Sequence, residues 1–289
     1  MLEVRPPKGS FGAEVVGVDL ARDSDNATLR ALLAALYEHR YVVIRDQRLG
    51  KVAYLDFGRR CGRPIPHVLD HLRMPDFPEM MVIGNAEKHF ENATVRNGAA
   101  FWHTDQSYEA EPASATMLDA VKAPGRGGQT LLADCQRAYD ALPVAMKQRI
   151  EGLHAWHFYG AASGRGREHV ASPLMNAEQT GRVPPVRHLI ARPHPVTGAK
   201  ALYAVAGTAY GVDGLSDAEG EALLAELKQH TLSPSFQAEH FYRVGDVAIC
   251  DTNATLHSGV PIDLPDGPGS ERHLWRISVR GRPAVLDQP

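Results

Sequence analysis

The sequence predicts a mainly β protein with helical insertions, built on a β-sandwich or jelly roll. After Pro64 the chain becomes a series of short apolar runs separated by turn residues, among them EMMVIGN, SATMLDAV, GGQTLLADC and DVAIC. Helical periodicity is confined to a few segments, and many short strands with few helices are typical of these two architectures. No linker or internal repeat interrupts the chain, so we expect one domain over residues 1–289.

The helical segments carry recognisable start and stop signals. The first helix is expected to begin at Asp25 or Asn26 and is followed by a buried strand, YVVIRDQ. A second helix is expected over Lys51 to Cys61, ended by a glycine. Two later helical insertions lie in CQRAYDALPVAMKQRIEGL and SDAEGEALLAELKQHTL, the second opened by a Ser216–Glu219 capping box.

One long segment, residues 160–185, has no period and is rich in Gly, Ser, Arg and Pro. We interpret it as a surface loop. Loops of this length in compact domains are either lids and binding loops or disordered segments, and the sequence leaves both readings open.

Composition and charge exclude several classes of function. The formal net charge is −3 with no long run of like charges, which gives no basis for binding nucleic acid or an anionic membrane surface. Neither a signal sequence nor an apolar run of membrane-spanning length is found, so we expect a cytoplasmic protein. The three cysteines are widely spaced, which favours buried, reduced thiols over a disulfide framework or a zinc site.

The strongest local signal for chemistry is FWHTDQSY. His103 and Asp105 are two residues apart, so on an extended strand both side chains point to the same side. A third ligand is offered by His257, which follows the apolar run VAIC and a polar turn. Two imidazoles and one carboxylate form a facial triad that leaves positions open, as non-haem iron(II) requires.

The segment ERHLWRISVRG strengthens this interpretation. Strict alternation places Arg272 and Arg276 on one face of a strand, whereas Ile277 and Val279 on the other face resemble core residues. A guanidinium group binds carboxylates through two parallel hydrogen bonds. Two arginines on one face, shortly after a candidate metal ligand, therefore indicate a site for carboxylates.

These residues together resemble the taurine dioxygenase and 2,4-dichlorophenoxyacetate dioxygenase family of iron(II)/2-oxoglutarate enzymes (TauD/TfdA). The family pattern is His-x-Asp, a Thr or Ser about two dozen residues later, a distant His, and then an Arg. His103 and Asp105 match the first element, Thr130 the second, His257 the third and Arg272 the last. The likeness extends over most of the chain, from FGAEVVGVDL to ERHLWRISVRG.

The resemblance implies a role for each matched residue. His103, Asp105 and His257 would bind iron, whereas Arg272 and Thr130 would hold the distal carboxylate of 2-oxoglutarate. The candidate substrate contacts are Arg276, His67, Gln106 and Asn97. The chain has more residues between His257 and Arg272 than the family usually shows, and DLPDGPGS is a credible insertion there. If the alignment is shifted instead, Arg276 would take the 2-oxoglutarate role.

The resemblance also implies a double-stranded β-helix (jelly-roll, cupin-like) core and a reaction. Iron(II), 2-oxoglutarate and O2 would together hydroxylate a small, anionic organic substrate, with release of succinate and CO2. Asp105 favours hydroxylation or desaturation, because halogenases of the family lack this carboxylate. The alternatives are a cupin-like metal hydrolase or isomerase, which would use the same ligands with zinc, and a non-catalytic 2-oxoglutarate sensor. Relatives often associate, so a homodimer or tetramer is possible.

Overall fold

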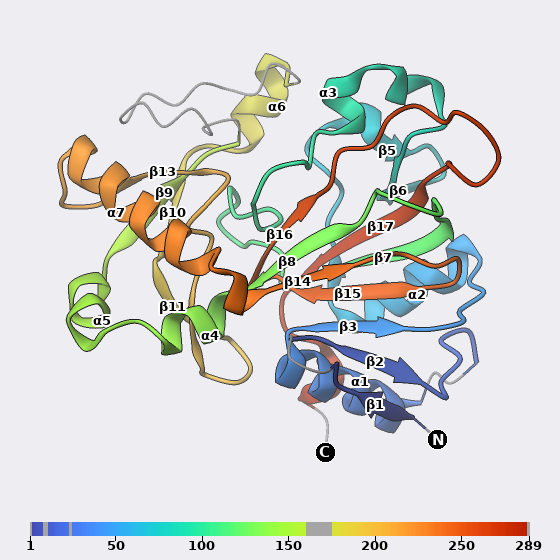
Figure 1. Ribbon diagram of the computed structural model, residues 1–289, viewed down its shortest axis with the longest axis horizontal. Coiled ribbons are helices and arrows are strands. Elements are labelled where there is room, and N and C mark those ends of the chain that lie inside the picture. Colours follow the sequence, from blue (N-terminus) through green and yellow to red (C-terminus); the bar gives the residue numbers. More distant parts are fainter. Residues whose placement is uncertain (1, 8–10, 23–24, 160–174, 288–289) are drawn as a thin grey trace.

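A large twisted sheet forms the centre of the protein (Figure 1). The computed structural model describes residues 2–7, 11–22, 25–159 and 175–287. Neighbouring strands of the sheet are antiparallel except β2 and β3, which run parallel. In order across the sheet the strands are β1 (Glu3–Arg5), β2 (Ala13–Val16), β3 (Tyr41–Ile44), β15 (Val247–Asp251), β7 (Ala115–Lys122), β17 (His273–Arg280), β6 (Phe77–Gly84) and β5 (Arg73–Met74), with β4 (Arg63–Pro64) paired to β17.

A smaller sheet faces the large one and completes a jelly-roll core. It consists of β14 (Gln237–His240), β8 (Thr130–Asp134) and β16 (Thr255–Gly259). Leu132 of β8 packs in one buried cluster with Val43, Ala248 and Leu274 of the large sheet. The mainly β class with helical insertions is therefore confirmed.

Two helices cover the outer face of the large sheet (Figure 1). Helix α1 (Asn26–His39) is capped by Asp25, whose side chain accepts the backbone N–H of Thr28. Helix α2 (Lys51–Cys61) ends at Gly62, where φ is +158°. A Cβ at Gly62 would lie 2.8 Å from the carbonyl oxygen of Arg280, so only glycine fits at this close approach.

A second group of helices and strands lies at one end of the core (Figure 1). The helical segment expected after Cys135 is divided by Pro143, which lacks the N–H that a continuous helix needs. The Ser216–Glu219 capping box is confirmed. The elements are α4 (Cys135–Asp140), α5 (Val144–Ile150), α7 (Asp217–Thr231), the sheet β10 (Val186–Leu189), β9 (His154–His157) and β13 (Ala209–Val212), and the pair β11 (Ala191–Pro193) and β12 (Lys200–Leu202).

The prediction of a loop over residues 160–185 was wrong for its last part. Residues 160–174 lie outside the described residues, but helix α6 (Ala177–Arg182) follows them. Asn176 and Gln179 form its capping box, a pattern of Asn rather than Ser or Thr that the sequence interpretation overlooked. The remaining short elements are α3 (Ala93–Arg96), η1 (Asp70–Leu72), η2 (Lys88–Glu91), η3 (Pro234–Phe236) and η4 (Ala284–Leu286).

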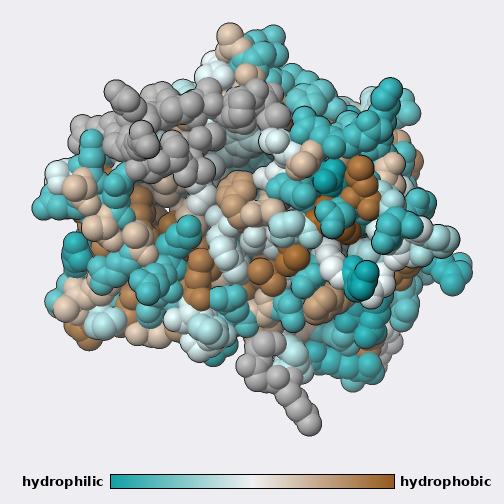
Figure 2. Space-filling model, turned by 45° about the horizontal axis from the view of Figure 1, so that its top comes forward, coloured by the Kyte–Doolittle hydropathy of each residue, from teal (hydrophilic) through white to brown (hydrophobic). Residues whose placement is uncertain are grey.

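Hydrophilic and hydrophobic residues are mixed on the surface, as the interspersed charges of the sequence predict. On the face shown in Figure 2, hydrophobic residues reach the surface in small groups separated by hydrophilic ones. All three cysteines are buried and free. Among the described residues, no helix combines the length and the apolar character needed to cross a membrane.

Candidate active site

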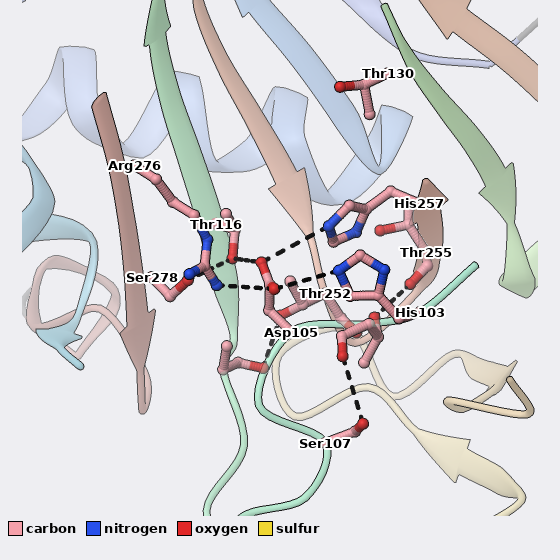
Figure 3. A network of polar contacts seen from close by, with 12 residues as sticks. His103, Asp105, Ser107, Thr116, Thr130, Thr252, Thr255, His257, Arg276 and Ser278 are labelled. Carbon is pink, nitrogen blue, oxygen red and sulfur yellow. Dashed lines mark hydrogen bonds and ion pairs between the residues drawn. The ribbon is translucent and has the colours of Figure 1, made fainter. Parts of the chain in front are cut away.

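The structure brings His103, Asp105 and His257 together, with one ligand atom of each lying within 4.8 Å of the others (Figure 3). His103 forms an isolated bridge with His257 of β16, in which each backbone N–H donates to the other residue's carbonyl, at 2.9 and 2.8 Å. The expectation of an extended strand through His103 and Asp105 was wrong, because Asp105 already lies in a turn. His257 follows a polar turn, as expected, but the turn ends at residue 254 and His257 lies inside strand β16.

Hydrogen bonds fix the orientation of two of the three side chains. His103 Nδ1–H donates to the carbonyl of Phe101 at 2.7 Å, which leaves the Nε2 lone pair free to bind a metal. Asp105 Oδ2 accepts from the Thr116 hydroxyl at 2.6 Å, and Oδ1 lies 2.8 Å from Arg276 Nη2. These contacts hold the carboxylate beside the two imidazoles, 3.7 Å from His103 Nε2 and 3.8 Å from His257 Nε2.

The charge states of the three side chains also suit a metal. Burial lowers the pKa of His103, and burial together with the neighbouring His103 lowers the pKa of His257 to about 3. Burial opposes ionisation of Asp105, but Arg276 and the two histidines hold its pKa well below the usual range. Neutral imidazoles and an ionised carboxylate are the forms that bind metals, so this donor set fits iron(II).

A cavity of about 190 Å³ opens beside these three residues. Its described lining holds three arginines, Arg96, Arg272 and Arg276, but a single carboxylate, that of Asp105. The cavity is therefore suited to anions. The six other site residues expected from the sequence also line this cavity: His67, Asn97, Gln106, Thr130, Arg272 and Arg276.

Arg272 marks one end of the cavity. Its side chain is 5% exposed, its Nε has no hydrogen-bond partner, and no ion pair is found for it among the described residues. Its Nη1 donates only a long hydrogen bond, 3.4 Å, to the carbonyl of Gly128. Burial lowers its pKa. Nearby, the hydroxyls of Thr130 and Tyr242 lie 2.9 Å apart. Burying a cation without a counter-charge costs free energy, so this end of the cavity is suited to binding a carboxylate.

Arg276 and His67 mark the other end. Burial and the nearby Arg276 lower the pKa of His67 to about 3, so its ring is neutral. Its Nδ1 accepts the backbone N–H of Leu69 at 3.1 Å, which places the ring proton on Nε2. His67 is thereby a hydrogen-bond donor, and Arg276 supplies the positive charge.

Gln106 and Asn97 differ in what they can offer a ligand. Gln106 has a left-handed backbone (φ 48°), and its buried Oε1 has no hydrogen-bond partner within the described part of the chain. Asn97 lines the cavity too, but both ends of its carboxamide bind the backbone of Ile262, at 2.9 and 3.4 Å. The Asn97 amide therefore supports the cavity wall, whereas Gln106 retains a free acceptor.

The sequence interpretation missed several residues of the site. Thr116 binds Asp105, and the Tyr159 ring lies 6.2 Å from His67 and 4.7 Å from Tyr108, measured between ring centroids. The alternation of SATMLDAV could have shown that Thr116 faces inwards, but nothing in the sequence shows which strand lies opposite Asp105. Tyr159 directly precedes the segment of residues 160–185 and carries no periodic signal.

Behind the metal ligands lies a buried chain of hydrogen bonds through His157. The Ser107 and Thr208 hydroxyls lie 2.7 Å apart, and Thr208 lies 3.1 Å from His157 Nδ1. Burial, with His188 and Arg192 nearby, lowers the pKa of His157 to about 3. The folded protein therefore does not protonate this ring in mild acid.

We expect His157 to make the protein sensitive to acid. Its pKa is about 3 when folded and about 6.5 when unfolded. Below pH 6.5 only the unfolded chain takes up this proton, so His157 alone should contribute about 1.4 kcal/mol per pH unit to the fall in the free energy of unfolding between about pH 6 and pH 4. In urea titrations over this range, His157→Gln should show a shallower fall than the wild type. Equal slopes would contradict the expectation.

The sequence as a whole matches known proteins. Residues 3–278 match the model of the family described as taurine catabolism dioxygenase TauD, TfdA family. The chain belongs to the TauD/TfdA family. A (S)-phenoxypropionate/α-ketoglutarate dioxygenase of Sphingobium herbicidovorans is 31% identical over 291 residues, covering 98% of this chain and 96% of the relative. An α-ketoglutarate-dependent sulfate ester dioxygenase of Pseudomonas putida is 30% identical, covering 98% and 91%.

Solved structures agree with this assignment to the TauD/TfdA family. A taurine dioxygenase from Burkholderia xenovorans superimposes with a TM-score of 0.77 at 27% identity, covering 97% of this chain and 89% of the other. The protein is thus a 2-oxoglutarate (α-ketoglutarate)-dependent dioxygenase, whose cofactors are iron(II), 2-oxoglutarate and O2. The reaction class and the jelly-roll fold expected from the sequence are confirmed.

Proposed function

We propose that this dioxygenase hydroxylates a small organic anion with an apolar body and releases succinate and CO2. The observation that carries the proposal is the placement of Arg272 and Arg276 in one cavity with His103, Asp105 and His257. One arginine would bind 2-oxoglutarate and the other the substrate, so that two anions would bind in one cavity beside His103, Asp105 and His257.

The assignment of Arg272 to 2-oxoglutarate rests on its surroundings. Arg272 has no carboxylate partner among the described residues, and the hydroxyl of Thr130 lines the same cavity. Arg276 already contacts Asp105, one of the metal ligands. Arg276 is therefore the arginine nearer the metal centre, and Arg272 is better suited to the far carboxylate of a chelating co-substrate.

The substrate class follows from the opposite end of the cavity. Arg276 and the Nε2–H of His67 offer a charge and a hydrogen bond to a carboxylate, sulfonate or sulfate group. Much of the remaining cavity lining is apolar, which favours an aryl or alkyl body in the substrate. Relatives named for phenoxypropionate, 2,4-dichlorophenoxyacetate and sulfate esters act on molecules that combine an anionic group with such a body. The apolar part of the lining, called the apolar wall below, includes Leu69, Leu72, Phe90, Val95 and Tyr159.

Each group of residues then has one task in the reaction. Iron(II) and 2-oxoglutarate, when bound, supply the activation of O2. His103, Asp105 and His257 hold the metal and leave positions open for 2-oxoglutarate and O2. Arg276 and His67 orient the substrate so that a C–H bond near its anionic group faces the metal, and the apolar wall excludes water.

Asp105 decides the kind of oxidation. With the carboxylate present as a third ligand, no position is freed for a halide, so hydroxylation or desaturation is favoured over halogenation. A hydrolase would use the same three ligands but would not need Arg272, whose Nε has no hydrogen-bond partner among the described residues, and a sensor would not need to keep all three ligands. A cytoplasmic location and a homo-oligomer stay predictions of the sequence.

Turnover of matched acids and amides tests this function. With iron(II), 2-oxoglutarate and O2, phenoxyacetate or hexanesulfonate should stimulate succinate release. Phenoxyacetamide should be poorer by about 100-fold in kcat/KM, since a hydrogen bond to a charged group contributes about 1.5–3 kcal/mol. Equal turnover of acid and amide would contradict an anionic substrate. Failure of every aryl and alkyl anion to stimulate succinate release would contradict the substrate class.

A further inference from the structure

Arg276 contacts Asp105, a candidate metal ligand, and also lines the cavity in which the substrate is proposed to bind. Its Nη2 lies 2.8 Å from Asp105 Oδ1 (Figure 3), and its side chain also lines the cavity. The residue is 8% exposed, and its Nη1 contacts Met81 Sδ at 3.0 Å. Among the described residues, Asp105 is the only carboxylate that forms an ion pair with Arg276. A group bound to Arg276 therefore acts on the same guanidinium that holds a metal ligand.

Both oxygens of Asp105 are already engaged. Oδ2 accepts from Thr116 at 2.6 Å, and the Thr116 hydroxyl lies 2.8 Å from that of Ser278. The contact with Arg276 at Oδ1 differs in kind, because it joins opposite charges. A divalent metal at the same carboxylate would share the negative charge with a guanidinium a few ångströms away and be repelled by it.

We propose that Arg276 opposes metal binding by competing for the charge of Asp105, and that an anion bound to Arg276 relieves this competition. Metal and anion would then bind interdependently, each tightening the binding of the other by the same factor. The first half of this proposal concerns the metal alone. The second half rests on the proposed function, since it takes the substrate's anionic group to be the ligand of Arg276.

A different role for Arg276 would give the opposite result. A residue that only orients a metal ligand weakens metal binding when it is removed, by about 10- to 100-fold. A competing cation strengthens metal binding when it is removed. The sign of the change in metal affinity therefore separates competition from orientation.

The test is a titration of the whole protein with Mn(II), followed by the EPR signal of the free ion. Arg276→Met should bind Mn(II) at least about tenfold tighter than the wild type. Arg280→Met is the matched control: Arg280 lies on the same strand, pairs with Glu109, and is not among the cavity residues. It should bind as the wild type does. Equal or weaker binding by Arg276→Met would overturn the proposal. If that variant does not fold, as judged by circular dichroism, Arg276→Gln provides the same comparison.

A second titration tests the link to the anion. Phenoxyacetate at saturation, with its binding measured by calorimetry, should tighten Mn(II) binding by the wild type several-fold and leave Arg276→Met unchanged. Binding of phenoxyacetate with no change in Mn(II) affinity would overturn the link. Failure of phenoxyacetate to bind would contradict the proposed substrate class, and the Mn(II) affinity of Arg276→Met would still decide the competition.

Discussion

His257→Ala is expected to weaken metal binding severely and, with it, turnover. The side chain is one of the three candidate ligands, and the loss leaves only the pair His103 and Asp105. Replacing residues that merely orient a ligand already lowers metal affinity by about 10- to 100-fold, so the loss of a ligand should exceed about 100-fold and lower succinate release by about 1,000-fold. Mn(II) titration and succinate release measure the two effects.

The matched control for this variant is His39→Ala. His39 lies in the last turn of α1, on the outer side of the large sheet, and is not among the cavity residues. It should retain the affinity and activity of the wild type. Wild-type affinity for Mn(II) in His257→Ala would show that the metal is bound elsewhere.

Arg272→Met is expected to lose 2-oxoglutarate while gaining stability. The guanidinium is buried with an unpartnered Nε, so an apolar side chain of similar length should raise the free energy of unfolding by about 1–3 kcal/mol without co-substrate. The same change removes the partner of the distal carboxylate and should weaken 2-oxoglutarate binding by about 2–4 kcal/mol, or about 30- to 1,000-fold. The measurements are urea unfolding and anaerobic titration of the visible charge-transfer band of the iron(II)–2-oxoglutarate complex.

The charge-transfer band also shows which of the two arginines binds 2-oxoglutarate. In Arg276→Met it should form at concentrations of 2-oxoglutarate close to those of the wild type, once iron(II) is saturating. If Arg276→Met loses the band and Arg272→Met keeps it, the two assignments are exchanged and the shifted alignment is correct.

Much of the site was predictable because β17 alternates strictly. Its period of two, extended to Arg272 just before the strand, separates Arg272 and Arg276, which line the cavity, from Ile277 and Val279, which pack in the core against α1 and α2. His103 and Asp105 were found for the wrong local reason, since a turn rather than a strand aims the carboxylate. Their identity was predictable from residue type and order, because metal chemistry restricts the choice of ligands.

Contacts between separate segments could not be predicted. Thr116 of β7 reaches Asp105 in a turn, and Tyr242, just after β14, reaches Thr130 of the neighbouring strand β8. A single sequence shows the period of each strand but not its neighbours. Two local patterns would have been sufficient to predict elements that the sequence interpretation missed. Pro143 predicts the break between α4 and α5, and Asn176 with Gln179 predicts α6.

The backbone bridge between His103 and His257 has a consequence for how the protein matures. The two histidines lie in different halves of the chain, and their mutual hydrogen bonds form only when β16 has been synthesised and has docked beside residue 103. A nascent chain that has emerged only through its first half presents His103 and Asp105, too few ligands to retain a metal. Iron can therefore be retained only after β16 has been synthesised and has docked, and its uptake reports that these two segments have come together.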